Sequence, residues 1–139
     1  MLLRSGRLLM LLRDNQTRIL HLVRSDDGGR TWSTATATGI IDYPAHLLEL
    51  PDRRVACVAG RRSHPFGITL YLSQDGGETW PADRPIMVRS GLINRDLGYP
   101  TMALRTDGSL FIAYYAQDRS GVTGIQASLL KAEVINGRD

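Results

Sequence analysis

The sequence predicts an all-β fold built from repeated antiparallel sheets of four strands. Two observations support this prediction. An eight-residue segment at residues 25–32 has a near copy at residues 73–80, and each copy follows a run of strand-forming residues. Short apolar runs separated by turn residues also recur three times along the 139-residue chain. No stretch carries a convincing helix signal, so we expect a chain of strands and turns.

The two copies share the pattern S-x-D-x-G-x-T-W, which predicts a tight turn between two strands. The matching residues are Ser25, Asp27, Gly29, Thr31 and Trp32 in the first copy and Ser73, Asp75, Gly77, Thr79 and Trp80 in the second. In such a turn the Asp side chain accepts hydrogen bonds from nearby backbone N–H groups, and Gly supplies a positive φ. The Trp ring is expected to pack beneath the turn as an apolar plug.

Three segments of the chain show the same order of strands and turns. The first has expected strands at residues 7–12 and 18–24 around a turn at 14–17, and its first strand is cut short. The second has strands at 45–50, 54–60 and 68–72, with a turn at 51–53. The third has strands at 101–105, 109–115 and 125–134, with a turn at 106–108 and no third copy of the motif.

The spacing of the segments matches that of β-propeller blades. Ser73 follows Ser25 by 48 residues, and a four-stranded blade takes about 40–50 residues. Tyr99 follows Tyr43 by 56 residues, and the excess falls in the connection at residues 81–96. The middle strands are apolar throughout at 8–12, 55–59 and 110–114, which is typical of strands covered on both faces. We therefore predict one partial β-propeller domain over residues 1–139, with a blade remnant at 1–40 and blades at 41–96 and 97–139.

Composition excludes several classes of function. The chain is 42% hydrophobic and 22% charged with a net charge of +3, and it has no basic run, so we expect no nucleic-acid partner. No apolar run is long enough to span a membrane. Residues 1–13 are broken by Arg4, Arg7 and Arg13, which favours a strand over a signal peptide and leaves the cellular location open.

The metal-binding and redox-active residue types are isolated from one another. Cys57 is the only cysteine and lies within an apolar run, which indicates a buried, inert thiol. His21, His46 and His64 have no spacing typical of a zinc site. We expect neither a metal nor a cofactor.

The repeated turn motif resembles the Asp box, or BNR repeat, of the sialidase (neuraminidase) superfamily and of its non-catalytic relatives. In that family the box joins the third and fourth strands of a blade, on the rim away from the active site. The resemblance implies a structural role for Asp27 and Asp75. It also implies that this chain corresponds to the C-terminal blades of a six-bladed propeller.

The predicted blades are too few to close a ring, since propellers contain about four to eight blades. Either the chain is part of a longer six-bladed protein, or copies of it assemble as a homo-oligomer that covers the open blade flanks. An open stack would leave the apolar flanks of its two end blades in water.

Tyr99 is the candidate catalytic residue. In sialidases a Tyr nucleophile precedes the first strand of the last blade, in a pattern similar to the residues from Tyr99 to Leu110 followed by Tyr114 and Tyr115. A phenolate spreads its charge, and it attacks an anomeric centre beside a carboxylate with less repulsion than Asp or Glu would meet. The alternative is that Tyr-Pro only marks the start of a strand, because Tyr43 and Pro44 occupy the same place in the preceding blade.

The candidate substrate-binding residues are Arg61, Arg62, His64 and Tyr43. Sialidases hold the substrate carboxylate with three arginines, and Arg61 or Arg62 at a strand end resembles one of these, since a guanidinium can pair a carboxylate through two hydrogen bonds. A solvated loop arginine is the alternative. His64 and His46 could stack on a sugar or form hydrogen bonds with it, although surface histidines more often do neither.

The rest of the sialidase catalytic set has no match. The family's first arginine, its acid/base Asp and the Glu that activates the Tyr cannot be placed, and Glu49 is a poor candidate for that Glu. The resemblance therefore implies a sialidase-like glycoside hydrolase, acting on an acidic sugar or other glycan, in a fragment or incomplete form that is not active alone. The alternative is a non-catalytic Asp-box propeller module that binds glycan or protein, which leaves open whether the chain is an enzyme.

Overall fold

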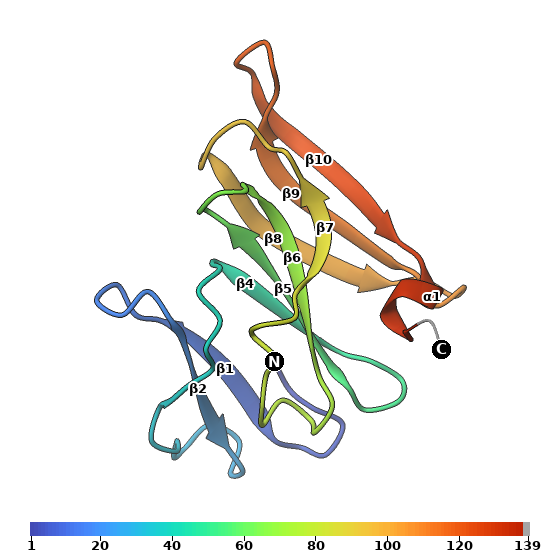
Figure 1. Ribbon diagram of the computed structural model, residues 1–139. Helices are drawn as coiled ribbons and strands as arrows, with labels where there is room; N and C mark the ends of the chain where they lie inside the picture. Colours follow the sequence, from blue (N-terminus) through green and yellow to red (C-terminus); the bar gives the residue numbers. More distant parts are fainter. Residues whose placement is uncertain (138–139) are drawn as a thin grey trace.

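The computed structural model describes residues 1–137 and consists of three antiparallel sheets that follow one another along the chain (Figure 1). The first sheet contains β1 (Leu8–Arg13), β2 (Leu20–Ser25) and β3 (Thr36–Ala37). The central sheet contains β4 (Ala45–Glu49), β5 (Val55–Arg61), β6 (Gly67–Ser73) and β7 (Ile86–Ser90). The third sheet contains β8 (Leu97–Leu104), β9 (Leu110–Gln117) and β10 (Thr123–Leu130).

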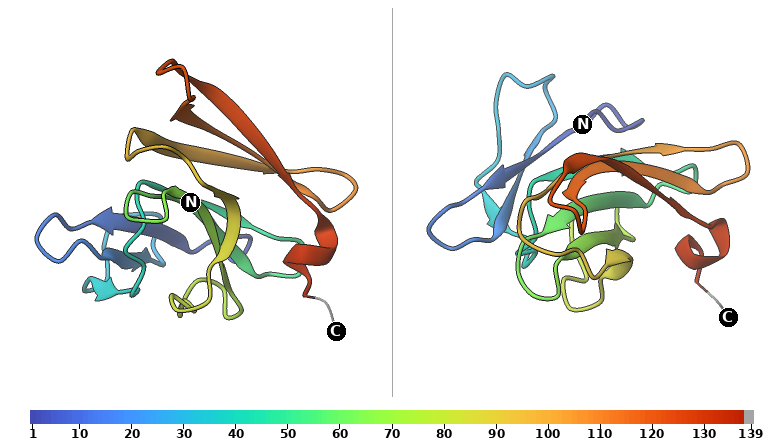
Figure 2. Two further views of the ribbon diagram at one scale, coloured as in Figure 1. Left: turned by 45° about the horizontal axis from the view of Figure 1, so that its top comes forward. Right: turned by 90° about the horizontal axis from the view of Figure 1, so that it is seen from above.

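The predicted all-β class is confirmed, and the sheets are those of partial propeller blades. Each pair of neighbouring strands is antiparallel. Figures 1 and 2 show the central sheet between the other two, with no closed barrel.

The structure differs from the expected strands near the C-terminus and in the connections. The strand expected at 125–134 ends at Leu130, and a short helix α1 (Ala132–Ile135) follows it. β3 and β7 were not expected, because β3 has only two residues and β7 lies in the long connection between two predicted blades. Within residues 1–137, no helix is long and apolar enough to cross a membrane.

Two apolar clusters hold the three sheets together. One combines Leu9 and Leu22 of the first sheet with Val55 and Cys57 of the central sheet. The other cluster joins the central sheet to the third sheet. Ala56 and Val58 of β5, Leu70 and Leu72 of β6, and Leu110 and Ile112 of β9 all belong to it. Alternate residues of β5 therefore face opposite neighbours, as the period of two in a strand requires.

Within residues 1–137, only the central blade has a middle strand that is covered on both faces. Residues 55–60 of β5 are all buried, whereas β1 and β9 alternate between buried and exposed positions. The prediction of three doubly covered strands is wrong for β1 and β9, because one flank of each end sheet has no neighbouring sheet. The apolar residues on those flanks include Met10 and Phe111, both of which are exposed.

The two copies of the turn motif join β2 to β3 and β6 to β7. In each, the Ser hydroxyl donates to the Asp carboxylate and accepts from the Gly N–H, as Ser25 does with Asp27 and Gly29. Ser73 makes the same bonds, with Asp75 and Gly77. The two turns thus close in the same way.

Both box carboxylates are held in their charged form. Hydrogen bonds from Thr31 and Ser25 lower the pKa of Asp27 to about 2. Partial burial alone would raise the pKa of Asp75, but hydrogen bonds from Thr79 and Ser73 outweigh it and lower that pKa to about 2 as well. A carboxylate with this many donors favours ionisation strongly.

The two box tryptophans are buried to different extents. Trp80 is 9% exposed and belongs to the cluster between the first and central sheets, as the plug expectation requires. Trp32 is 39% exposed, so the expectation that it is a buried plug is wrong. The Trp32 indole N–H donates instead to the carbonyl of Gly29, at 3.1 Å.

Candidate functional site

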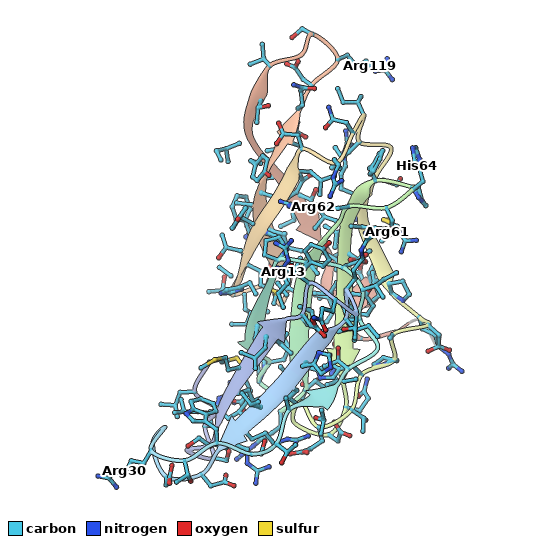
Figure 3. All side chains as sticks on the ribbon, turned by 90° about the vertical axis from the view of Figure 1, so that its left-hand side faces the viewer. Arg13, Arg30, Arg61, Arg62, His64 and Arg119 are labelled. Atoms are coloured by element: carbon cyan, nitrogen blue, oxygen red, sulfur yellow. The ribbon has the colours of Figure 1, made fainter. Side chains whose placement is uncertain are left out.

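One edge of the molecule collects most of the sequence-predicted site residues. β5 ends at Arg61, two residues after Ala59 pairs with the start of β4, and β8 begins at Leu97, where it pairs with the end of β9. In Figure 3 Arg13, Arg61 and Arg62 gather in one region, whereas Arg30, in the first box, extends from the far end of the molecule. We call the edge formed by Arg13, Tyr43, Arg61, Arg62 and Tyr99 the mouth edge.

Close backbone packing brings the central and third sheets together at this edge. A Cβ atom on Gly60 would lie 3.1 Å from the Cα of Gly98 and 3.3 Å from the carbonyl oxygen of Tyr43. The N–H of Tyr43 donates to the carbonyl of Gly60, which fixes the chain just before β4. Glycine at position 60 is therefore needed for the approach of the two sheets.

Arg62 is held in place by groups of the third sheet. Its Nε donates to the carbonyl of Leu97 at 3.0 Å, and its Nη2 donates to the hydroxyl of Tyr115 at 3.1 Å. A Cβ on Gly98 would come within 3.2 Å of Nη2, so the guanidinium lies directly against this backbone. Arg62 is thus a positioned cation and not a freely solvated loop arginine.

Tyr99 lies beside this guanidinium. Its ring centroid is 5.9 Å from the guanidinium carbon of Arg62 and 6.0 Å from the ring of Tyr115, with which it stacks. A cation at this distance from an aromatic face is attracted to it. Arg62, Tyr99 and Tyr115 therefore form one cluster.

The backbone presents Tyr99 to solvent. It was expected just before a strand, but it lies inside β8, where the register shifts between Gly98 and Thr101. Its φ of +45° is in the left-handed region, which is uncommon for a residue other than glycine and costs about 1–3 kcal/mol. The side chain is 69% exposed.

Arg61 contacts a buried carboxylate that the sequence analysis did not identify. Asp42 is fully buried and accepts hydrogen bonds from the hydroxyls of Thr69 and Tyr71, at 2.8 and 2.7 Å. Its Oδ2 lies 3.9 Å from Nη1 of Arg61. Burial, together with the hydrogen bond to Asp42, raises the pKa of Tyr71.

This cluster retains unused hydrogen-bonding capacity. Oδ1 of Asp42 and Nε of Arg61 are both buried and have no partner within residues 1–137. Because unpaired buried polar groups are costly, they are most often explained by a function or an unseen partner. The two unused atoms belong to residues that directly precede Tyr43 and Arg62 of the mouth edge in the chain.

The two other predicted substrate-binding residues, Tyr43 and His64, have different neighbours. Tyr43 faces the guanidinium of Arg13, whose carbon lies 4.2 Å from the ring centroid. His64 is exposed and contacts the ring of Phe66, with centroids 4.2 Å apart. Within residues 1–137, no three His, Cys, Asp or Glu side chains lie close enough together to hold a metal ion.

The sequence analysis missed three residues of this edge: Asp42, Arg13 and Tyr115. A signal existed for Asp42, since Thr69 and Tyr71 place two hydroxyls at alternate positions of a mostly apolar strand. Such a pair indicates a buried polar partner. Nothing local indicates which residue provides it, because Asp42 is 27 residues from Thr69.

Glu49 is excluded as a partner of Tyr99. It ends β4, at the opposite end of that strand from Tyr43, and accepts a hydrogen bond from the N–H of Arg4. At about 3.3 Å per residue, the length of β4 keeps its carboxylate away from the mouth edge. Within residues 1–137 no carboxylate is hydrogen-bonded to the Tyr99 hydroxyl.

Comparisons with known proteins agree with this architecture. A sequence model of the BNR repeat-like domain matches residues 1–112. No curated protein matches the chain. Among solved structures, a protein of unknown function from Dyadobacter fermentans DSM 18053 is similar, with 29% sequence identity and a TM-score of 0.78. The similarity covers 92% of this chain and 35% of that protein, so this chain spans about a third of its length. The resemblance predicted from the repeated turn motif is confirmed, and the chain belongs to the BNR repeat-like family.

Proposed function

We propose that the mouth edge binds the carboxylate of an acidic sugar and that the chain is a sialidase-like glycoside hydrolase with Tyr99 as its nucleophile. The observation that carries the proposal is the anchoring of Arg62. Two of its nitrogens are committed to Leu97 and Tyr115, and Nη1 makes no hydrogen bond within residues 1–137. The guanidinium is therefore held rigidly, with one nitrogen available to a ligand beside the Tyr99 phenol.

A fixed guanidinium supports carboxylate binding better than a mobile one. The cost in side-chain entropy is already paid in the free protein, so little further ordering opposes ligand binding. Arg61 lies next in the chain and is likewise restrained, by the Asp42 carboxylate. Arg13 adds a third cation at the same edge.

The chemistry assigned to Tyr99 is that of a retaining glycosidase. Its phenolic oxygen would form a bond to the anomeric carbon as the glycosidic bond breaks, and a water molecule would then release the sugar. Proton transfer to the leaving group and from the phenol requires acid and base groups. Residues 1–137 place no carboxylate against Tyr99, so these groups must come from outside this part of the chain.

That same absence favours a second candidate, a non-catalytic propeller module that binds an acidic glycan or another protein. The guanidinium cluster would serve this function equally well. In that case Tyr99 would act as a stacking surface for a sugar ring. Box repeats identify an architecture that carries both kinds of function.

Binding of N-acetylneuraminic acid, measured by ligand-observed NMR or calorimetry, tests the shared part of both candidates. We expect Arg62→Ala to weaken binding by about tenfold or more, because a charge-assisted hydrogen bond contributes about 1.5–3 kcal/mol. Arg30→Ala is the matched control, since Arg30 lies at the opposite end of the molecule (Figure 3). The methyl ester of the sugar, which lacks the negative charge, should bind no better to the wild type than to Arg62→Ala. Equal affinities of the wild type for the acid and for its ester would refute the proposed role of Arg62 in binding the carboxylate.

Hydrolysis of a fluorogenic sialoside separates the two candidates. If Tyr99 is the nucleophile, Tyr99→Phe should abolish turnover and leave binding of the free sugar nearly unchanged. Equal rates for the wild type and Tyr99→Phe would take Tyr99 out of the chemistry. Binding without any turnover, including in a longer protein that contains these blades, would establish the non-catalytic module.

A further inference from the structure

Tyr115 of β9 lies opposite an irregular part of β8. Gly98 pairs with Tyr115, and the register shifts before the next pair, which begins at Thr101. An extra residue in one strand produces such a shift and changes the direction of the side chains beside it. Tyr99 lies in the shifted part of β8, and its ring stacks on that of Tyr115 with centroids 6.0 Å apart. The irregularity therefore brings two phenols together at the mouth edge.

Gly98 leaves the space through which Arg62 reaches Tyr115. A Cβ at position 98 would lie 3.2 Å from Nη2 and 3.6 Å from Nε of Arg62, so the guanidinium crosses directly over this backbone. On the other side of that crossing, Nη2 donates to the hydroxyl of Tyr115 at 3.1 Å. Because Gly98 is the strand partner of Tyr115, one guanidinium from the central sheet contacts both members of a pair in the third sheet.

The direction of this hydrogen bond determines what the Tyr115 hydroxyl can still do. A guanidinium has five N–H donors and no acceptor, whereas a phenol is both a donor and an acceptor. The Tyr115 oxygen must therefore accept from Arg62 through a lone pair, and its own hydrogen points elsewhere. Within residues 1–137 no acceptor is hydrogen-bonded to that hydrogen, so the phenol keeps one unused donor.

Arg62 also keeps an unused donor group. Nε donates to Leu97 and Nη2 donates to Tyr115, but Nη1 has no partner in the part of the chain that the structure describes. The unused donors of Arg62 and Tyr115 thus belong to two groups that already contact each other. A carboxylate carries two equivalent acceptor oxygens on one carbon and can accept from both groups, whereas an ester keeps only one carbonyl oxygen.

We propose that Tyr115 is a second ligand-binding residue of the mouth edge. Its hydroxyl donates to one oxygen of the ligand carboxylate while Nη1 of Arg62 donates to the other. This inference rests on the proposed function and adds to it the residue that distinguishes a carboxylate from its ester by the number of acceptor oxygens. The phenol does so without adding a charge to the site.

A purely supporting role is the alternative, in which Tyr115 only accepts from Arg62 and holds the guanidinium in place. The two roles respond in opposite directions to the acidity of the phenol, because a more acidic phenol is a stronger donor and a weaker acceptor. Replacement of Tyr115 by 3-fluorotyrosine makes the phenol more acidic with little change in shape. A donor to the ligand should then bind more tightly, and a mere support for Arg62 should lead to weaker binding.

Binding of N-acetylneuraminic acid to the full chain, measured by calorimetry at about pH 6, is the test. Phenols are protonated at this pH. We expect tighter binding with 3-fluorotyrosine at position 115 and about tenfold weaker binding in Tyr115→Phe, which keeps the ring but loses the hydrogen bond. For the methyl ester, Tyr115→Phe should bind as the wild type does. Tyr114→Phe is the matched control, because its ring is buried and its hydroxyl contacts Ser128 instead.

The Arg62→Ala variant separates failure of this inference from failure of the proposed function. If Arg62→Ala weakens binding of the acid but the fluorinated protein binds equally or more weakly than the wild type, Tyr115 is not a donor to the ligand, and the proposed function stands without it. Equal losses in Tyr115→Phe and Tyr114→Phe would also overturn the inference. If the wild type binds the acid no better than Arg62→Ala does, the proposed function fails and this inference fails with it.

Discussion

Replacing Gly77 by alanine tests how tightly the first sheet packs on the second box. A Cβ at this position would lie 2.5 Å from Cδ1 of Leu9, whereas carbon atoms pack best at about 3.5–4.0 Å. Leu9 is almost completely buried, so it has little room to retreat. The φ of Gly77 is +92°, which strains any residue with a Cβ.

The two costs can be separated with Gly76. The left-handed backbone costs about 1–2 kcal/mol for alanine, and Gly76→Ala pays only this part, because φ is +72° and no atom lies within 4 Å of the new Cβ. Gly77→Ala adds an overpacking cost of about 1–3 kcal/mol. The lower part of that range is expected, since the contact atom is the end of a flexible side chain.

Urea unfolding followed by circular dichroism, with all variants at one protein concentration, measures this difference. We expect Gly77→Ala to lose about 1–2 kcal/mol more unfolding free energy than Gly76→Ala. Equal losses would mean that Leu9 moves away at no cost. The close packing of the first sheet on the second box would then not contribute to stability.

Three further predictions concern single side chains. The pKa of Asp75 is lowered from 3.8 to about 2 in the folded protein, so the stability it contributes is present above pH about 4 and is lost as the pH falls towards 2; Asp75→Asn should flatten that part of a melting-temperature profile, and an unchanged slope would contradict the pKa. Tyr71→Phe removes one of the two hydroxyl donors to the buried Asp42 and should cost about 1–3 kcal/mol in urea unfolding, with no loss expected if the carboxylate were solvated. Arg54 donates from Nη1 and Nη2 to Ile135 and Asn136; Arg54→Ala should therefore speed hydrogen exchange in α1 specifically, and uniform protection across the chain would refute the link.

The sequence predicted those features that depend on neighbouring residues. The two box turns and the hairpin strands around them follow from local patterns, because turn chemistry and strand alternation act over a few residues. The end of β10 at Leu130 was not predicted, because it has no such local signal. Val134 continues a run of strand-forming residues, and nothing local marks the start of the short helix.

Features that depend on packing between sheets could not be predicted. Trp32 and Trp80 stand in nearly identical eight-residue segments, yet only Trp80 is buried, because only the second box has a sheet in front of it. Asp42 is a similar case. Its partners come from β6, and its neighbour Arg61 comes from the end of β5, so no single segment contains the site.

The mouth edge depends on the same packing. Arg62 follows β5 of the central sheet, but both groups that fix its guanidinium belong to the third sheet, Leu97 in β8 and Tyr115 in β9. The proposed clamp therefore exists only while the two sheets stay in register, which the close approach of Gly60 to Gly98 enforces. A cation fixed in this way would favour an anion at this edge if the proposed function holds, whereas Arg30, on a single turn, has no such support. The proposed recognition at this edge therefore depends on the interface between two blades, and so does the chemistry proposed for Tyr99, because the guanidinium beside its ring is fixed by that interface.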